Sequence, residues 1–136
     1  MNKLEVKGVL FVVRGLPGSG KTTAAEFLAG ETCPVISADD FFYRDGEYKF
    51  DMNKLGAAHA NCKSRVEGEM LKSSPKVFVA NTFTTESEIN TYKKLADNHG
   101  YLFVSMIIEN RHGNTSVHNV PDETMKKMKD RFSIKL

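Results

Sequence analysis

Four short apolar runs recur along the chain and are separated by longer segments of mixed polarity. Each run is rich in β-branched and aromatic residues and lacks the strict alternation of a strand with one solvent-facing side. Such runs are typical of strands buried on both faces, as in a parallel sheet. The predicted strands are Val9–Val13, Pro34–Ser37, Lys76–Asn81 and Tyr101–Ile108.

The segments between these strands predict helices. The longest is Asp51–Lys72, where apolar residues recur at helical spacing. This stripe consists of Leu55, Ala58, Cys62, Val66 and Met70. A shorter helix is predicted over Lys21–Ala29. We expect it to turn four residues toward the sheet, namely Ala24, Ala25, Phe27 and Leu28.

Two further helices complete the pattern. Thr85–Asn98 has Thr85 as a cap and is closed by Gly100. The last helix opens at Pro121, because proline is tolerated in a first turn. Strand–helix alternation from end to end predicts an α/β fold with a short, mostly parallel sheet of about four strands, covered by helices on both faces. With no repeat or linker, residues 1–136 are expected to form a single domain.

Composition adds to the expected setting. The net charge of +2 does not single out a nucleic-acid binder, although it permits a local basic groove. No apolar run approaches the roughly 20 residues of a membrane span. Cys33 and Cys62 lie far apart, which is typical of buried thiols in a reducing compartment. We therefore expect a cytoplasmic protein that does not cross a membrane.

The link between the first strand and the first helix, Gly15–Thr22, matches G-x-x-x-x-G-K-[ST] in full. The flanking strand and helix are the context that this phosphate-loop motif requires. Glycines let backbone N–H groups point at phosphate oxygens, and the helix N-terminus adds partial positive charge. Lys21 is expected to reach the β- and γ-phosphates, and Thr22 to ligand Mg²⁺. The predicted nucleotide contacts are Gly15, Pro17, Gly18, Ser19, Gly20, Lys21, Thr22 and Thr23.

With this motif, the fold class is a three-layer P-loop NTPase of the kinase-like type. Transfer of a phosphoryl group also needs a proton acceptor and a cation for the developing charge. In an open parallel sheet, such groups lie at the carboxyl ends of the strands. Asp39 and Asp40 end the second strand, and Asp39 is the predicted general base. The competing interpretation is a pair of turn or cap aspartates.

Asn81 and Thr82 end the third strand, where many P-loop NTPases have an aspartate for Mg²⁺. Here no carboxylate is present at that point. Asn81 could hydrogen-bond a nucleophile or a metal-bound water, or simply end the strand. Asp40, His59, Asn81, Thr82 and His118 are the candidates for the acceptor side of the site.

The polar loop Asn110–Val120 separates the fourth strand from the last helix and is expected to act as a C-terminal lid. Within it, Arg111 is the candidate for the charge-stabilising arginine. His112 and His118 could contact phosphates or a base, or belong to a solvated loop. Arg14, directly before the phosphate loop, could be a structural partner or a phosphate contact.

The stretch Phe41–Phe50 is aromatic and charged, and Asp45–Gly46 is a turn signal within it. We expect a surface turn or small hairpin held by its rings. Aromatic side chains there could stack on a base, although such rings more often seal a core.

Several of these segments, taken in order, resemble the polynucleotide-kinase-type P-loop domains, which include the 5′-kinase domain of bacteriophage polynucleotide kinase and its small stand-alone relatives. The resemblance runs from Val9 to about Phe132. It rests on Arg14–Thr22, Ser37–Asp40, Tyr48–Asp51, Ala58–Cys62, Asn81–Thr82, Asn110–Gly113 and Val117–Pro121.

The resemblance implies ATP-dependent phosphorylation of a hydroxyl, typically the 5′-OH of a polynucleotide. It implies Asp39 as general base, Lys21 and Thr22 as phosphate and Mg²⁺ ligands, and Arg111 as an arginine of the lid. The chain departs from the family at Ala80, where an aspartate is frequent. It also lacks the basic residue that follows the aspartate pair and a clear second lid arginine.

The sequence thus predicts a kinase that uses ATP and Mg²⁺ and acts on nucleic-acid 5′ ends. Three alternatives stay open at this point. The acceptor could be a small nucleoside, a nucleotide or another hydroxyl compound. The protein could instead be a non-catalytic module whose nucleotide state regulates a partner. A slow ATPase is the third.

Overall fold

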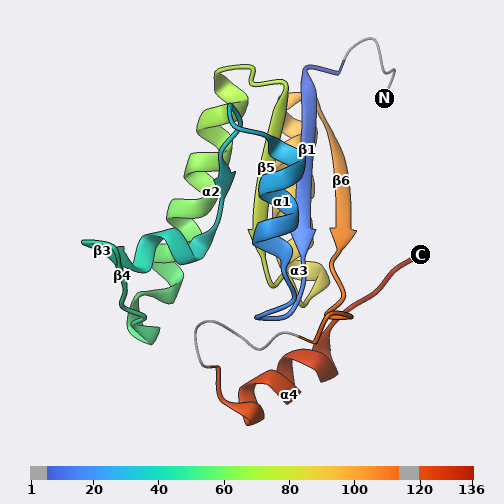
Figure 1. Ribbon diagram of the computed structural model, residues 1–136. Helices are drawn as coiled ribbons and strands as arrows, with labels where there is room; N and C mark the ends of the chain where they lie inside the picture. The colour runs from blue at the N-terminus through green and yellow to red at the C-terminus, as the bar shows by residue number, and fades with distance from the viewer. Residues whose placement is uncertain (1–5, 114–119) are drawn as a thin grey trace.

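A four-stranded parallel sheet forms the centre of the computed structural model, which describes residues 6–113 and 120–136 (Figure 1). The strand order is β2-β5-β1-β6, and every neighbouring pair is parallel. The four predicted strands are therefore confirmed. Their bounds are β1 Gly8–Arg14, β2 Val35–Ile36, β5 Lys76–Asn81 and β6 Tyr101–Ile107.

The second strand is shorter than predicted, since Ser37 already begins the short 3₁₀ turn η2 (Ala38–Phe42). The Ser37 hydroxyl accepts a hydrogen bond from the Asp39 amide at 3.1 Å and so caps that turn. The backbone therefore leaves the sheet at Ile36, and the Asp39 side chain is presented from a turn rather than from a strand.

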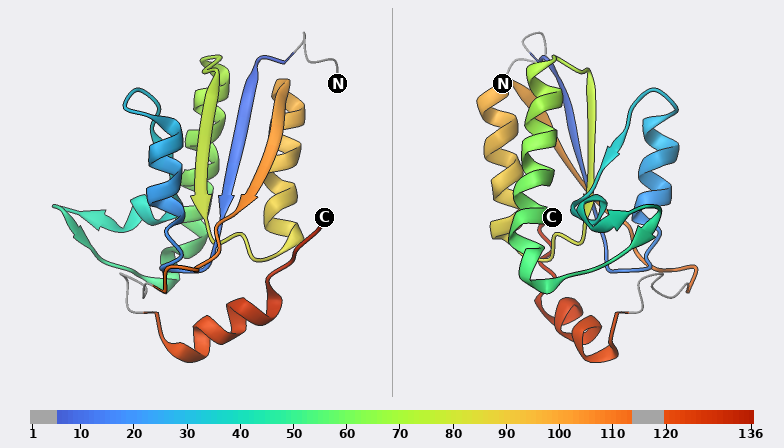
Figure 2. Two further views of the ribbon diagram at one scale, coloured as in Figure 1. Left: turned by 45° about the vertical axis from the view of Figure 1, so that its right-hand side comes forward. Right: turned by 90° about the vertical axis from the view of Figure 1, so that its left-hand side faces the viewer.

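Helices cover both faces of the sheet (Figure 2). α1 lies on one face, and α2 and α3 lie on the other, while α4 crosses beyond the carboxyl ends of the strands. The chain runs from β1 to β2, returns to β5 between them and then passes β1 to reach β6, so the connections leave β1 and β5 in opposite directions. The helices are α1 Lys21–Ala29, α2 Leu55–Leu71, α3 Glu86–His99 and α4 Asp122–Arg131.

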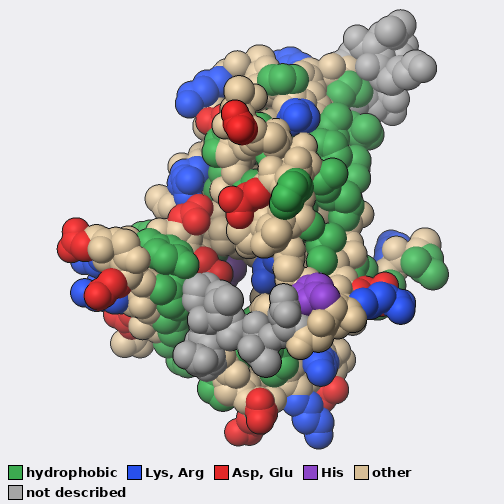
Figure 3. All heavy atoms as spheres, viewed as in Figure 1, with side chains coloured by type: hydrophobic (Ala, Val, Ile, Leu, Met, Phe, Trp, Pro, Cys, Tyr) green, Lys and Arg blue, Asp and Glu red, His purple; other side chains and the backbone are tan. Residues whose placement is uncertain are grey.

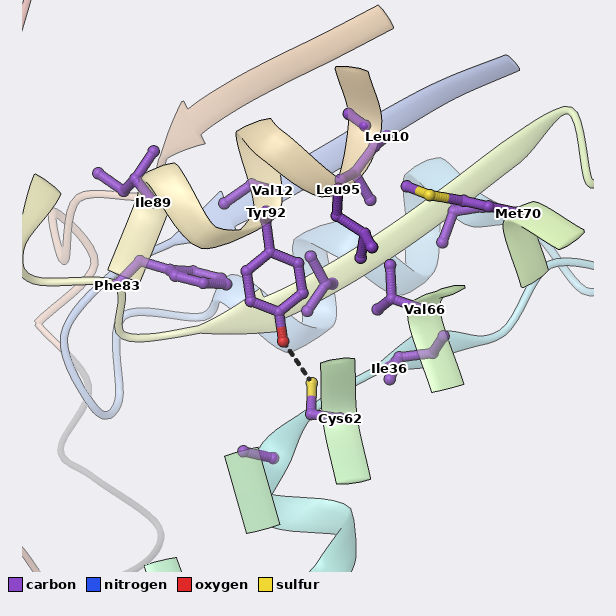
Figure 4. Close-up of a cluster of buried hydrophobic side chains, with 14 of the residues drawn as sticks. Leu10, Val12, Ile36, Cys62, Val66, Met70, Phe83, Ile89, Tyr92 and Leu95 are labelled. Carbon is purple, nitrogen blue, oxygen red and sulfur yellow. Dashed lines mark hydrogen bonds between the residues drawn. The ribbon is translucent and has the colours of Figure 1, made fainter. Parts of the chain in front are cut away.

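The strands point alternate side chains to the two faces, which gives two apolar cores. The larger core packs Leu10 and Val12 of β1 against α2 and α3 residues such as Cys62, Val66 and Leu95 (Figure 4). The smaller core, on the side of α1, is made by Val13, Phe78, Ala80, Ala25 and Ala29. Burial on both faces explains the continuous apolar runs of the central strands β1 and β5. The expectation does not hold for β6, which lies at the edge of the sheet and is partly exposed.

The predicted orientation of α1 is wrong in part. Ala25 and Ala29 are buried, but Phe27 and Leu28 are 86% and 55% exposed. The helix begins at Lys21, directly after the phosphate loop, so the loop and not the bulk of the side chains sets its rotation. Leu55 is also exposed, because it is the first residue of α2 and lies at the end of the apolar stripe.

The predicted hairpin is confirmed as β3 (Tyr43–Arg44) paired with β4 (Glu47–Tyr48). Its turn residues Asp45 and Gly46 both have positive φ, 52° and 80°, which is the twist that a two-residue hairpin favours. A second short 3₁₀ turn, η3 (Met52–Lys54), leads from the hairpin into α2.

Arg14 ties the end of β1 to the C-terminal segment. It is buried, and it donates to the carbonyls of Phe83 at 2.9 Å and Ser133 at 2.5 Å. Its guanidinium lies 4.6 Å from the centre of the Phe132 ring. The Ser133 amide in turn donates to the Thr84 carbonyl at 2.8 Å. These contacts make Arg14 a structural residue, which the sequence did not decide.

No helix in residues 6–113 and 120–136 combines the length and the apolar character needed to cross a membrane.

We expect Arg14→Ala to lower the free energy of unfolding by about 2–4 kcal/mol, because two buried carbonyls lose a charged donor. Urea denaturation of the two proteins would measure this. Lys93→Ala is the matched control, since Lys93 forms an exposed pair with Asp97 within α3, worth about 0.5 kcal/mol. Equal losses in the two variants would contradict the structural role of Arg14.

Candidate functional site

The phosphate loop lies at the carboxyl end of β1, beside the switch point between β1 and β5. Gly18 and Gly20 have φ values of 85° and 91°, a region that favours glycine. A Cβ atom on Gly15 would overlap the Ser19 hydroxyl. The motif glycines are therefore required by the local backbone as well as by the approach of a phosphate.

The Ser19 hydroxyl is buried and has no hydrogen-bond partner within residues 6–113 and 120–136. A buried hydroxyl without a partner is costly unless a further group satisfies it. Its position inside a loop of inward-curling backbone fits a phosphate oxygen as that group. This observation supports the predicted phosphate site independently of the motif.

Lys21 folds back over the loop, where its Nζ lies 3.5 Å from the Leu16 carbonyl oxygen. Burial lowers the pKa of Lys21, and the negative charge of Asp39 opposes part of that shift. The Asp39 carboxylate therefore lies within electrostatic range of the Lys21 ammonium group. A cation held in partial burial beside the loop is well suited to bind phosphate.

The aspartate pair divides into two different environments. Asp40 accepts hydrogen bonds from the Ser37 amide at 3.0 Å and from Arg65 at 2.9 Å, so it caps η2 and pairs with α2. Asp39 instead accepts a hydrogen bond from the Tyr48 hydroxyl at 3.3 Å. Burial, together with the charge of Asp39, raises the pKa of Tyr48 to about 12, so Tyr48 remains a neutral donor.

Asn81 holds the turn that carries Asp39. Its side-chain oxygen accepts hydrogen bonds from the Ala38 amide at 2.9 Å and from the Ser37 hydroxyl at 3.3 Å. Its amide group donates to the Cys62 sulfur at 3.6 Å. Asn81 is buried, so it connects the ends of β5 and β2 rather than facing an acceptor.

The buried chain continues behind Asn81. The Tyr92 hydroxyl donates to the Cys62 sulfur at 3.3 Å (Figure 4). Burial raises the pKa of Cys62 and of Tyr92, which keeps both groups neutral. Sequence reasoning missed this network, since Cys62 counts as an apolar member of a helical stripe and Tyr92 lies far from it in the sequence.

His112 contacts the phosphate loop directly. Its Nε2 lies 2.8 Å from the Ser19 carbonyl oxygen, to which it donates, and its ring covers Gly20. Thr82 supports the other end of the loop, since its carbonyl accepts a hydrogen bond from the Gly15 amide at 3.4 Å. The sequence proposed His112 as a phosphate or base contact, whereas here it binds the loop backbone.

Two other candidates, Arg111 and His59, are exposed. Arg111 is exposed and pairs with Glu109 at 2.9 Å. His59 is exposed on α2. His118 lies outside the described residues. The structure thus brings together Lys21, Asp39 and the loop, and places Arg111 in solvent.

We expect Lys21→Met to raise the free energy of unfolding at neutral pH while it removes ATP binding. Burial disfavours the charged ammonium in the folded protein, and the substitution relieves this cost. This gain in the free energy of unfolding is full at pH values below the lowered pKa of Lys21 in the folded protein. It disappears as the pH rises through the ordinary value of 10.5, because Lys21 is then neutral in both the folded and the unfolded protein. Urea denaturation across pH measures it, and Lys94→Met, on the exposed side of α3, should show no gain. A loss of stability in Lys21→Met would contradict the reasoning.

Asn81→Ala should lower the free energy of unfolding by about 1–3 kcal/mol, because the buried Ala38 amide loses its acceptor. Asn90→Ala, at an exposed position of α3, is the control and should change stability by less than about 0.5 kcal/mol. Chemical denaturation measures both. Similar values for the two variants would show that Asn81 does not hold the turn.

Comparison with known proteins shows the family to which this chain belongs. A family model described as an AAA domain matches residues 10–134. Human NEDD4-binding protein 2 is 36% identical over 95 residues, which cover 68% of this chain but only 5% of that protein. The chain thus spans a small part of the curated relative that it matches.

Solved structures share the fold. A kinase candidate from Chloroflexus aurantiacus aligns with a TM-score of 0.59 and 20% identity, over 76% of this chain and 60% of that one. APS kinase from Mycobacterium tuberculosis aligns with a TM-score of 0.55 and 15% identity, over 93% of this chain and 97% of that one. At these identities the likeness concerns the fold alone. Because the family model spans nearly the whole chain, the protein belongs to the AAA domain family and has a P-loop kinase-like fold.

Proposed function

We propose that this protein is an ATP-dependent kinase that transfers the γ-phosphate to an acceptor hydroxyl, with a polynucleotide 5′-OH as the best candidate. The observation that carries the proposal is the position of Asp39. It is a carboxylate in the turn η2 that follows β2, within electrostatic range of Lys21 and bonded to the Tyr48 hydroxyl. A kinase requires a proton acceptor on the side of the phosphate loop that its cation occupies.

The loop would hold the donor. Backbone N–H groups, the N-terminus of α1 and the Ser19 hydroxyl fit the phosphate oxygens. Lys21 neutralises charge between the β- and γ-phosphates. Thr22 would hold Mg²⁺, which when bound supplies further charge neutralisation to the phosphates.

On the acceptor side, Asp39 takes the proton as the hydroxyl oxygen forms its bond to the γ-phosphorus. The bond between that phosphorus and the β–γ bridging oxygen breaks, and the electron pair stays on ADP. Tyr48 orients the carboxylate through Oδ1. Asn81 fixes the backbone of the turn from beneath, so it is a positioning residue.

Arg111 has a role only if it leaves its present partner. Its pair with Glu109 is exposed, and such pairs contribute about 0–1 kcal/mol. Exchange of Glu109 for a triphosphate therefore costs little. We include Arg111 as the residue that stabilises charge on the transferred group once ATP is bound.

The choice of a polynucleotide as acceptor is supported by the resemblance of the ordered segments to polynucleotide-kinase-type domains. Among these segments, Ser37–Asp40 and Tyr48–Asp51 flank the hairpin, and the first presents Asp39. A small nucleoside, a nucleotide or another hydroxyl compound is the alternative acceptor for the same chemistry.

A second candidate is a non-catalytic module that uses nucleotide binding to regulate a partner. The observation in its favour is the end of β5, where Ala80 and Asn81 have no carboxylate for Mg²⁺ and the Asn81 side chain is already bonded to the turn. The name of the human relative describes binding to another protein. This candidate requires tight nucleotide binding without turnover.

Asp39→Asn should reduce transfer of radiolabelled γ-phosphate to 5′-OH oligonucleotides by roughly 10²–10⁴-fold, because an amide cannot accept the proton. ATP affinity, measured by calorimetry, should change little. Asp40→Asn is the control, since Asp40 caps η2 and should affect stability more than transfer.

The outcomes separate the two candidates. Equal loss of transfer and of ATP binding in Asp39→Asn would exclude Asp39 as the base. Tight ATP binding by the wild-type protein, with no transfer to DNA, RNA, nucleosides or other hydroxyl compounds, would favour the regulatory module.

A further inference from the structure

An open groove of about 530 Å³ lies beside the β3–β4 hairpin, between η2 and the start of α2. Its lining comprises three phenylalanines, one methionine, three basic side chains and one acidic side chain. Figure 3 shows a band of hydrophobic side chains on this projection of the molecule, with charged groups at its tip. For the sequence stretch that forms it, stacking on a base is one of two open interpretations.

The apolar part of the groove is exposed but well supported. Phe50 and Met52 are 51% and 75% exposed. Beneath them Phe42 is buried, and its ring lies 5.1 Å from that of Phe50 and 5.6 Å from that of Phe41. These three rings, which meet edge-on or tilted, form an aromatic floor in which Phe50 presents an exposed ring to a planar ligand.

The charges of the groove are unbalanced toward positive. Within the described part of the chain, no carboxylate lies within ion-pair distance of Arg44 or Lys54. Lys49 is only loosely paired with Glu47, at 3.7 Å. Asp51, the acidic residue of the lining, caps η3 by accepting from the Asn53 amide. The groove is thus suited to an anion with apolar planar groups.

One ring of the groove lining, that of Phe42, contacts the tyrosine that binds the candidate base. Tyr48, which donates to Asp39, packs edge-on against Phe42 with ring centres 6.2 Å apart. Phe42 in turn belongs to the aromatic floor. A chain molecule with its first hydroxyl at Asp39 could therefore run outward along this floor.

We infer that this groove binds single-stranded nucleic acid, namely the nucleotides that follow the 5′ end held at Asp39. A base stacks on Phe50, and Arg44 and Lys54 contact backbone phosphates. Stacking on aromatic rings beside basic groups is how proteins bind single strands without reading sequence. The inference rests on the proposed function for the position of the 5′ end, but the binding itself does not require catalysis.

Binding can be measured without ATP, by fluorescence anisotropy of a short oligo(dT) labelled at its 3′ end. We expect Phe50→Ala to weaken binding about five-fold or more, through loss of a stacked base. Lys54→Ala should weaken binding and reduce its salt dependence. Phe27→Ala and Lys94→Ala, exposed on α1 and α3 away from the groove, are the matched controls and should bind as the wild type does.

An abasic DNA strand of equal charge, used as a second ligand, distinguishes base stacking from electrostatic attraction to the backbone. Phe50→Ala should weaken binding of oligo(dT) but not of the abasic strand. The inference is overturned if wild-type protein does not bind oligo(dT), if Phe50→Ala binds it as tightly as Phe27→Ala does, or if an acidic peptide of equal charge competes as well as oligo(dT).

Failure of the proposed function gives a different result. In that case no acceptor is phosphorylated, yet oligo(dT) still binds in a manner that depends on Phe50 and Lys54. If the kinase proposal holds and the groove proposal fails, the wild type phosphorylates an acceptor while Phe50→Ala and Lys54→Ala retain the wild-type affinity for oligo(dT).

Discussion

The geometry of this site depends on one buried amide at the end of β5. The Asn81 side-chain oxygen accepts a hydrogen bond from the Ala38 backbone amide and so joins β5 to the turn that presents Asp39. Buried polar groups without partners are costly, which makes this arrangement nearly obligatory once the strands have paired. Cys62 and Tyr92 hold Asn81 from behind, so the larger core and the site share one network. A residue that ends a strand thereby determines where a carboxylate lies relative to the phosphate loop.

The loop is held in a similar way, by groups from neighbouring strand ends. The Thr82 carbonyl accepts a hydrogen bond from the Gly15 amide. At the other end of the loop, the His112 ring donates a hydrogen bond to the Ser19 carbonyl. The Ile108 amide donates to the Arg14 carbonyl at 2.7 Å, which fixes the point where the loop leaves β1. A loop that is pre-shaped by its surroundings does not have to be ordered by the nucleotide, and this lowers the entropic cost of binding.

The extent to which sequence predicts this structure follows from the range of the interactions. The strands, the helices and the hairpin follow from local patterns, and so does the phosphate loop, where a glycine pattern fixes the backbone. The different environments of Asp39 and Asp40 depend on Tyr48 and Arg65, and no local pattern encodes them. The contact of His112 with Ser19 spans 93 positions. The exposure of Phe27 has the same origin, because the rotation of α1 is set by the loop that precedes it.

The attachment of the C-terminal segment has a mechanical consequence. In the described part of the chain, its hydrogen bonds to the rest of the protein come from Arg131 and Ser133, which follow or end α4. In the described residues the hydrogen-bonded anchor of α4 is therefore at its C-terminal end, which would be the fulcrum of any rotation of the helix. Ten residues of helix span about 15 Å, so a rotation of about 20° about that fulcrum would carry Asp122 by about 5 Å. Arg14, which binds the fulcrum, is also the residue that enters the phosphate loop, so strain at one would be felt directly at the other.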